Sequence, residues 1–139
     1  MDVVYTNDMS IIEEDMLEGG FFVGWPNPPD TAAHLKLLCG SFCAFTAIDT
    51  KSGKVVGFIN AVSDGVLSAY IPLLEVLPEY QGRGIGGKLV EHMLAALGNL
   101  YMIDIVCDED IAPFYVKDGA KIHGRACIFR NYEAQSGRV

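Results

Sequence analysis

Apolar and polar residues along the chain follow two periods, one typical of strands and one typical of helices. Apolar or alternating runs predict strands at 3–6, 42–48, 55–61, 67–77 and 101–107, and one or two more within 120–132. Apolar residues at helical spacing predict helices at 11–18, 31–39, 84–97 and 111–117. This order, a meander of hairpins before a strand–helix–strand unit, is typical of a mixed α/β (α+β) domain.

Caps and helix breakers mark the ends of several of these elements. Ser10, followed by Glu13 three residues later, matches a capping box and predicts the start of the first helix. The prolines within 21–29 forbid a regular element there, so we expect an ordered, aromatic-rich loop. Pro72 lies inside the long strand 67–77 and predicts an edge, a bulge or a broken ladder.

The chain has 139 residues, the size of one domain with one core, and we expect a single domain over 1–139. Half of the residues are apolar, and the formal net charge is -8. This acidic balance argues against nucleic acid as a partner, because phosphate binding requires clustered Lys and Arg. An acidic surface instead attracts cationic molecules, amines among them.

The four cysteines lack the spacing of a zinc site, and each lies in an apolar stretch. We expect reduced core thiols in a reducing compartment, at Cys39, Cys43, Cys107 and Cys127. The N-terminal residues show no basic region followed by an apolar run, and no apolar run approaches the ~20 residues of a membrane span. These features predict a cytoplasmic protein without a metal or a membrane partner.

The most informative segment is a turn with four glycines among residues 82–87, between a predicted strand and a predicted helix. Glycines let the backbone approach a ligand, and the first turn of a helix offers unpaired N–H groups, so the segment predicts a phosphate-binding site. Two patterns fit imperfectly. The dinucleotide fingerprint requires an acid at a strand end, but Asp104 lies within its strand. The Walker A pattern requires Ser or Thr where Leu89 stands.

A third pattern reads Q-x-x-G-x-G and is preceded by V-x-P at residues 76–78. Together they resemble the acyl-CoA-binding signature of the GNAT superfamily of N-acetyltransferases. The resemblance implies acetyl-CoA as the acyl donor, with its pyrophosphate bound by backbone N–H groups of the turn and Arg83 as an added charge. The residues implied are Gln81, Gly82, Arg83, Gly84, Ile85, Gly86 and Gly87.

The same resemblance assigns roles to the strand before the turn. Backbone groups of Leu74 and Val76 contact the pantetheine arm, and a backbone N–H of this strand lies near the thioester carbonyl. Such a donor stabilises the oxyanion that forms when an amine attacks. Asp108 stands where the family often has an Asn that contacts pantetheine.

A second match lies about thirty residues further on, where Phe114 to Ala120 resembles the F-Y-x-K-x-G-F element of the same superfamily. There the resemblance implies that Tyr115 is the general acid, whose hydroxyl protonates the departing thiolate. Ala120 replaces the final Phe of the element.

An attacking amine must also lose a proton, and the candidate bases are Glu75, Glu79, His34 or a chain of waters. Of these, Glu75 neighbours the strand's backbone contacts. Side chains expected to contact the acceptor are Phe22, Trp25, His34 and Tyr70.

The resemblance as a whole implies a mixed, mostly antiparallel sheet of six to seven strands flanked by about four helices, and a possible homodimer. It implies an N-acetyltransferase that moves the acetyl group of acetyl-CoA to a primary amine by direct attack in a ternary complex. The acidic balance and Trp25 slightly favour a small cationic amine. Two alternatives stay open at this point. One is a non-catalytic acyl-CoA-binding or regulatory module, and the other is a nucleotide-binding domain that uses the same glycines.

Overall fold

The computed structural model describes residues 2–137, which form one five-stranded sheet with helices on both faces. The strands follow one another in space as in the chain: β1 (Val3–Thr6), β2 (Cys43–Asp49), β3 (Lys54–Ser63), β4 (Ser68–Val76) and β5 (Met102–Ile105). Neighbours are antiparallel except β4 and β5, which are parallel. The mixed, mostly antiparallel sheet is confirmed, but the prediction of six to seven strands is wrong.

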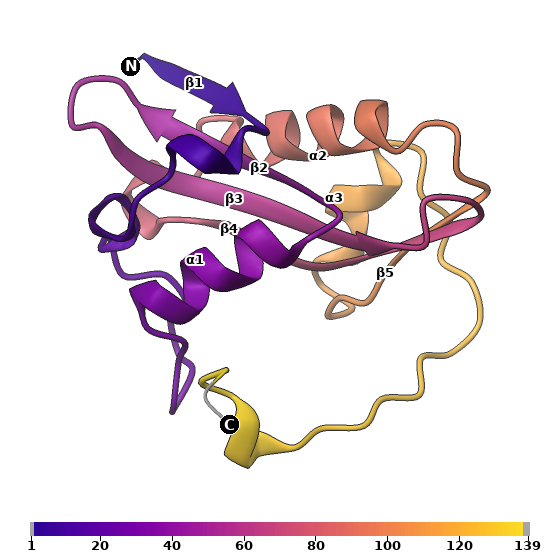
Figure 1. Ribbon diagram of the computed structural model, residues 1–139. Coiled ribbons are helices and arrows are strands. Elements are labelled where there is room, and N and C mark those ends of the chain that lie inside the picture. The colour runs from indigo at the N-terminus through magenta and orange to yellow at the C-terminus, as the bar shows by residue number, and fades with distance from the viewer. Residues whose placement is uncertain (1, 138–139) are drawn as a thin grey trace.

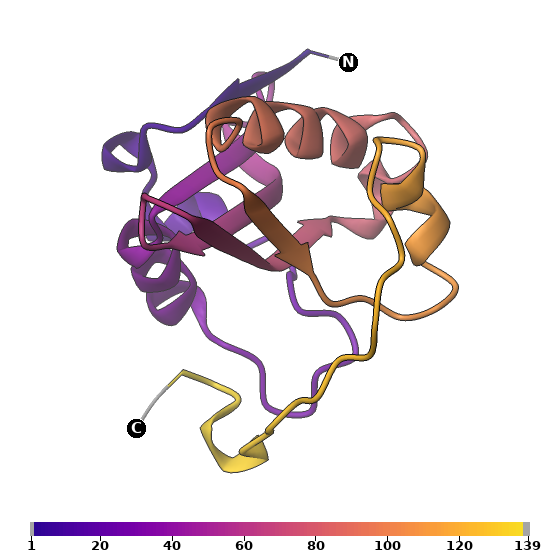
Figure 2. The ribbon, with the colours of Figure 1, turned by 90° about the vertical axis from the view of Figure 1, so that its right-hand side faces the viewer.

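Two α-helices cover opposite faces of the sheet, and a third follows β5 (Figure 1, Figure 2). They are α1 (Thr31–Gly40), α2 (Ile85–Ala96) and α3 (Ala112–Val116). Adjacent residues of β3 show the two faces, because successive side chains of a strand point in opposite directions. A Cβ on Gly57 would lie 3.2 Å from Leu89 of α2, whereas the ring of Phe58 packs 4.4 Å from His34 of α1.

The first predicted helix does not form as one element. Residues 9–17 make two short 3₁₀ turns, η1 (Met9–Ile11) and η2 (Glu14–Leu17), so the expected four α-helices are three. The predicted N-cap at Ser10 is also wrong, because Asp8 caps η1 and accepts from the Ser10 N–H. Ile12 and Leu17 are both buried. On one continuous helix, two residues that are five positions apart would point about 140° away from each other. The break between the two turns lets both side chains reach the core.

The predicted strands within 120–132 are absent. Residues 120–131, which we call the C-terminal arm, run extended from α3 to the short turn η4 (Tyr132–Ala134) without joining the sheet (Figure 1). The arm leaves α3 through Gly119, whose φ of +99° turns the chain away from β5. At its far end, the Gln135 Oε1 accepts from the backbone N–H of Asn27 at 3.0 Å. Within residues 2–137, β5 is therefore an open edge of the sheet.

Two other predictions have simple outcomes. No helix among residues 2–137 is long and apolar enough to cross a membrane. The four cysteines are free, but the expectation of core thiols is wrong, since Cys43 alone is half-buried and Cys39, Cys107 and Cys127 are exposed. Apolar sequence neighbours predicted burial, but Cys107 lies beside the open edge, Cys127 lies in the arm, and Cys39 lies on the exposed side of α1.

Candidate functional site

The sheet opens between β4 and β5 at Pro72. The parallel ladder pairs Ser68–Ile71 with Met102–Ile105 and stops there, whereas β4 continues to Val76 beside β3 alone. The register between β3 and β4 also shifts at this point. The predicted irregularity at Pro72 is confirmed. In the described part of the chain, residues 72–76 form an edge without a second neighbouring strand, so their outward backbone groups are open to a ligand.

The turn after β4 carries backbone N–H groups that no other residue uses. Gly82 and Gly84 have φ values of +75° and +83°, which L side chains rarely adopt, and Gly84 is the N-cap of α2. Among residues 2–137, no residue accepts a hydrogen bond from the backbone N–H groups of Gly82, Gly84, Ile85, Gly86 and Gly87. Because these donors lie at the positive end of α2, they are suited to bind an anion.

Side chains hold this turn in place. The Gln81 Nε2 donates to the Val76 carbonyl at 2.9 Å, which ties the turn back to the end of β4. The Tyr80 hydroxyl donates to Asp49 Oδ2 at 2.8 Å, and the Arg83 guanidinium lies 5.4 Å from the Tyr80 ring centroid. Gln81, expected to contact a ligand, thus spans the turn instead, and it occupies a carbonyl that was expected to face pantetheine.

Charged side chains of both signs lie beside the turn, around a cavity of about 470 Å³ between α2 and the end of α3. Lys88 and Lys117 line it, together with the acids Glu91 and Asp118. Lys88 pairs with Glu91 at 3.1 Å, and the Lys117 ammonium lies 5.0 Å from the Phe114 ring centroid. Two lysines and two acids thus flank the turn, and Lys88 is engaged with Glu91.

Helix α3 packs against the turn and carries Tyr115. A Cβ on Gly86 would meet the Phe114 ring at 3.5 Å, so the helix and the turn are in contact. Tyr115 is half-buried and packs edge-on against Phe114, with ring centroids 5.1 Å apart. Burial, and secondarily the nearby Cys107, raise the pKa of Tyr115 above its ordinary value. The hydroxyl therefore keeps its proton at neutral pH and can serve as a proton donor.

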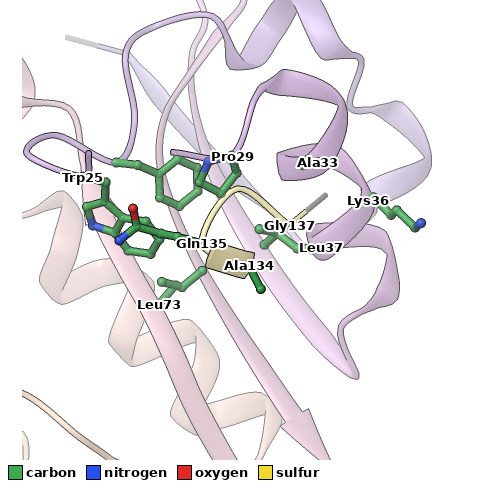
Figure 3. A pocket seen from close by; sticks show the side chains of 10 residues that line it. Trp25, Pro29, Ala33, Lys36, Leu37, Leu73, Ala134, Gln135 and Gly137 are labelled. Carbon is green, nitrogen blue, oxygen red and sulfur yellow. The ribbon is translucent and has the colours of Figure 1, made fainter. Parts of the chain in front are cut away.

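A second cavity of about 330 Å³ lies on the α1 face of the sheet (Figure 3). Trp25 and Phe22, whose ring centroids are 5.0 Å apart, form one wall, and Leu73 of β4 forms another. The Lys36 side chain points away from the cavity (Figure 3). The remaining lining residues are Pro29, Ala33, Leu37, Ala134, Gln135 and Gly137. The walls are mostly apolar and suit the carbon skeleton of a small molecule.

Glu75 lies beside this cavity, two residues after Leu73 and on the same face of β4. Its Oε1 accepts from the Phe22 backbone N–H at 2.8 Å, and its Oε2 is buried without a partner among the described residues. Burial raises the pKa of Glu75, although the Phe22 hydrogen bond opposes the shift. A carboxylate with one fixed and one unpaired oxygen is suited to accept a proton or a hydrogen bond from a ligand.

The family model described as "Acetyltransferase (GNAT) family" matches residues 13–120, a span that includes β4, the turn and α3. The chain belongs to the GNAT family. The family membership that Q-x-x-G-x-G and the Phe114–Tyr115 element indicated is therefore confirmed.

Three relatives show how far the likeness extends. The chain is 38% identical to a protein of Deinococcus radiodurans R1 assigned as an acetyltransferase, whose crystal structure matches 97% of this chain and 92% of its own at a TM-score of 0.92. It is 41% identical over 66 residues to GCN5-related N-acetyltransferase 3, chloroplastic, of Arabidopsis thaliana, covering 46% of this chain but only 28% of that protein. Aminoglycoside N-acetyltransferase AAC(6')-Iy in complex with CoA shares the fold at 17% identity and a TM-score of 0.61, over 94% of this chain and 93% of its own.

Within this GNAT domain, His34 does not line the cavity, although its ring packs against Phe22 of the cavity wall. It is 2% exposed and is surrounded by the rings of Phe21, Phe22 and Phe58 at 4.4–5.1 Å. Its Nε2 has no hydrogen-bond partner among residues 2–137, and burial lowers its pKa to about 4. The expectation that His34 contacts the acceptor is not met, because apolar packing of α1 on β3 encloses the ring.

His34 makes stability depend on pH. Because its pKa is about 4 in the folded chain and near 6.5 when unfolded, we expect the free energy of unfolding to fall as pH drops from 6.5 to 4. The loss attributable to this group reaches about 3 kcal/mol at the lower limit. Glu75 acts in the opposite sense, because its raised pKa favours the folded, protonated form in acid. The check is chemical denaturation of the parent and of His34→Leu at pH 7 and pH 4.5, in which the parent should lose more unfolding free energy at the lower pH. Equal losses of unfolding free energy in the two proteins would contradict this assignment.

The structure leaves two predicted contacts outside these cavities. Tyr70 lies where β4 still pairs with both neighbours, opposite Val62 and beside Asp104, and it lines neither cavity. Asp108 is exposed after β5, and its backbone carbonyl accepts from Ile111 and Ala112 at the start of α3.

Among the lining residues that the sequence did not predict are Leu73, Lys117 and Gln135. The position of Leu73 in the cavity wall can be deduced from the alternation of side chains along β4 once the face that carries Glu75 is known. Lys117 lies within the motif at 114–120 but had no role assigned to it. Gln135 reaches the cavity from the far end of the chain, and no local pattern signals this. No group of three or more His, Cys, Asp or Glu side chains in the described residues is arranged to hold a metal ion.

Proposed function

We propose that the chain transfers an acetyl group from acetyl-CoA to a small primary amine by direct attack in a ternary complex. The observation that carries this proposal is the set of unused N–H groups of Gly82 and residues 84–87, which follows the open edge of β4 and lies against the helix of Tyr115. In this proposal, the diphosphate of acetyl-CoA binds the N–H groups of the turn, and its pantetheine arm lies along the open edge of β4. The thioester then lies near the Tyr115 hydroxyl, which is the proton donor.

The residues present fit acetyl-CoA as a substrate. A Cβ at Gly82, Gly84 or Gly87 would meet nothing within 4 Å, so the side of the turn that carries the donors is open. Arg83, Lys88 and Lys117 supply charge for the phosphates. Leu74 and Val76 keep their proposed backbone contacts, although the Val76 carbonyl already accepts from Gln81. Asp108 is retained as a candidate pantetheine contact.

The proposed chemistry uses three groups of this chain. Glu75 accepts a proton from the ammonium of the acceptor, so that the nitrogen lone pair attacks the thioester carbonyl carbon. A backbone N–H of the open β4 edge donates to the oxygen as it gains charge. When the carbon–sulfur bond breaks, Tyr115 donates its proton to the leaving sulfur. The attacking nitrogen gives up its second proton to the Tyr115 phenolate, Glu75 returns its proton to solvent, and an amide and the free thiol of CoA result.

The second cavity supports an acceptor that joins a primary amine to an apolar group. Phe22, Trp25 and Leu73 provide apolar walls, and Trp25 offers an aromatic ring to a cation. The unpaired Glu75 Oε2 lies beside this space, and the net charge of -8 attracts amines to the surface. Tyr70 remains a candidate contact for larger acceptors.

The direct test is release of free thiol from acetyl-CoA across a library of primary amines, matched in size and differing in apolar or polyhydroxyl character. We expect turnover with apolar amines above that with polyhydroxyl amines. Acetyl-CoA binding without turnover of any amine would instead indicate the non-catalytic module. Stabilisation against thermal unfolding by ATP or NAD, but not by acetyl-CoA, would remove the proposal.

Replacing Glu75 with glutamine is expected to lower kcat by about 10²-fold, because the amide still accepts from the Phe22 N–H but cannot take a proton. The acidic limb of the pH dependence of kcat/KM should disappear with it. The matched control is Glu79→Gln, since Glu79 is exposed on the short turn η3 (Pro78–Tyr80), four residues further on. If Glu79→Gln lowers kcat and Glu75→Gln does not, the base is assigned wrongly.

A further inference from the structure

The short turn η4 brings residues from beyond the C-terminal arm to the cavity on the α1 face (Figure 3). Asn131 caps the turn, because its Oδ1 accepts from the Glu133 backbone N–H at 3.2 Å. After the turn, Gly137 lies against α1, since a Cβ there would meet the Cβ of Ala33 at 3.6 Å. The turn and the residues after it therefore form part of the cavity wall.

Gln135 brings a side-chain amide to this wall, and one end of the amide is fixed. Its Oε1 accepts from the backbone N–H of Asn27, 108 positions earlier in the chain, at 3.0 Å. Because a backbone N–H only donates, the atom that faces it is the oxygen of the amide and not the nitrogen. The Gln135 Nε2 has no hydrogen-bond partner among residues 2–137. The N–H groups of a held amide are therefore left for a ligand.

The side chains that line the cavity in the described part of the chain offer apolar surface and N–H donors. Three of them carry polar atoms: Trp25, Lys36 and Gln135. The Lys36 side chain points away from the cavity, whereas the Gln135 side chain extends toward Trp25 (Figure 3). A ligand that covers the Gln135 N–H groups with apolar surface costs them their hydrogen bonds to water, so this part of the wall favours an oxygen.

Glu75 provides the complementary polar group beside the same cavity. Its Oε1 accepts from the Phe22 N–H, and its Oε2 has no partner among the described residues. The carboxylate suits the ammonium group of an acceptor, the apolar walls suit its carbon skeleton, and the Gln135 amide suits an oxygen. Three kinds of group around one cavity thus correspond to three parts of one small molecule.

We infer that Gln135 is a specificity-determining residue, whose Nε2 donates to a carbonyl oxygen that the acceptor carries in addition to its amine. The acceptor is then an amino amide or a related amine with a carbonyl group on its carbon skeleton. The inference rests on the proposed acetyl transfer for its place in catalysis. Because the Gln135 amide takes no part in making or breaking bonds, it acts on the KM of the acceptor and leaves kcat unchanged.

The test pairs amino amides, in which one to four carbons separate the amine from the amide, with alkylamines that carry a methyl group in place of the amide. In the parent, one or more of the amino amides should bind more tightly than the paired alkylamine by about 2- to 10-fold, the range of one hydrogen bond. Gln135→Glu keeps an oxygen for the Asn27 N–H but replaces the free donor with an acceptor, so the preference should be lost or reversed. Gln135→Met, which has no N–H donor in its side chain, should remove the preference.

Binding is measured by ligand-observed NMR titration without acetyl-CoA, and kcat and the KM of the acceptor are measured separately. Glu133→Gln is the matched control, because that side chain is exposed in the same turn, and it should keep the parental preference. A preference that survives in both Gln135 variants, or a parent that prefers none of the amino amides, would overturn the inference. A preference in binding that depends on Gln135, without turnover of any amine, would support this inference and refute the proposed acetyl transfer.

Discussion

Replacing Tyr115 with phenylalanine is expected to lower kcat by about 10²- to 10⁴-fold, the range typical of a lost general acid. The change removes one hydroxyl and keeps the ring that packs against Phe114, so the fold and acetyl-CoA binding should be preserved. A thiolate without a proton donor is a poor leaving group, and the loss therefore falls on the chemical step. Because burial raises the pKa of Tyr115, the parent should lose activity only in strongly basic solution, and the variant should lack that limb of the pH profile.

The measurement is steady-state thiol release, together with calorimetric titration of acetyl-CoA. Tyr101→Phe is the control, because that tyrosine is 83% exposed and distant in sequence from the turn and from α3. A Tyr115→Phe variant that keeps the parental kcat would show that the proton reaches sulfur by another route, such as water. A variant with normal kcat but weakened acetyl-CoA binding would assign Tyr115 to binding instead.

Replacing Gly82 with alanine is expected to weaken acetyl-CoA binding by about 10- to 100-fold, which corresponds to one hydrogen bond to a charged group. The φ of +75° at Gly82 disfavours any L side chain. The loop of the variant must therefore either relax, which moves its N–H donors away from the diphosphate, or keep its conformation with a methyl group between the donors and the diphosphate. Kd measured by titration calorimetry with acetyl-CoA and with CoA should rise equally, because both carry the diphosphate.

Gly53 in the β2–β3 turn provides a matched control. Its φ is +71° and, as at Gly82, a Cβ would meet nothing within 4 Å. Alanine at either position should cost about 1 kcal/mol of stability through the same backbone conformation. Only the Gly82 variant should lose affinity. Equal affinities in the two variants would show that the turn does not hold the phosphates.

The parts of the fold that the sequence predicts are those with strong local signals. In the turn at 82–87, Gly82 and Gly84 stand where the left-handed conformation occurs, and Pro72 marks the point where the β4–β5 ladder stops. The first predicted helix failed because apolar spacing alone did not show that Ile12 and Leu17 both need burial. The C-terminal arm alternates like a strand, but whether a strand forms depends on a partner that local sequence does not specify.

The candidate site divides in the same way. The part proposed to bind acetyl-CoA could be predicted because its residues form a contiguous motif. The part proposed to bind the amine could not, because it joins residues that are 53 positions apart, such as Phe22 and Glu75. His34 shows the limit of residue-type reasoning, because a histidine beside an aromatic loop suggests a contact with substrate, yet three phenylalanine rings enclose it. Packing of this kind is decided by the tertiary fold.

The most direct test of the account follows individual main-chain amides as acetyl-CoA is added. In ¹H–¹⁵N spectra of the labelled protein, the resonances of Gly82, Gly84, Gly86 and Gly87 should move together and saturate with one equivalent, while that of Gly53 stays in place. The contradicting result is that these four resonances stay in place while resonances elsewhere on the sheet shift and saturate at one equivalent. It would mean that acetyl-CoA binds at a different site and not at the turn after β4.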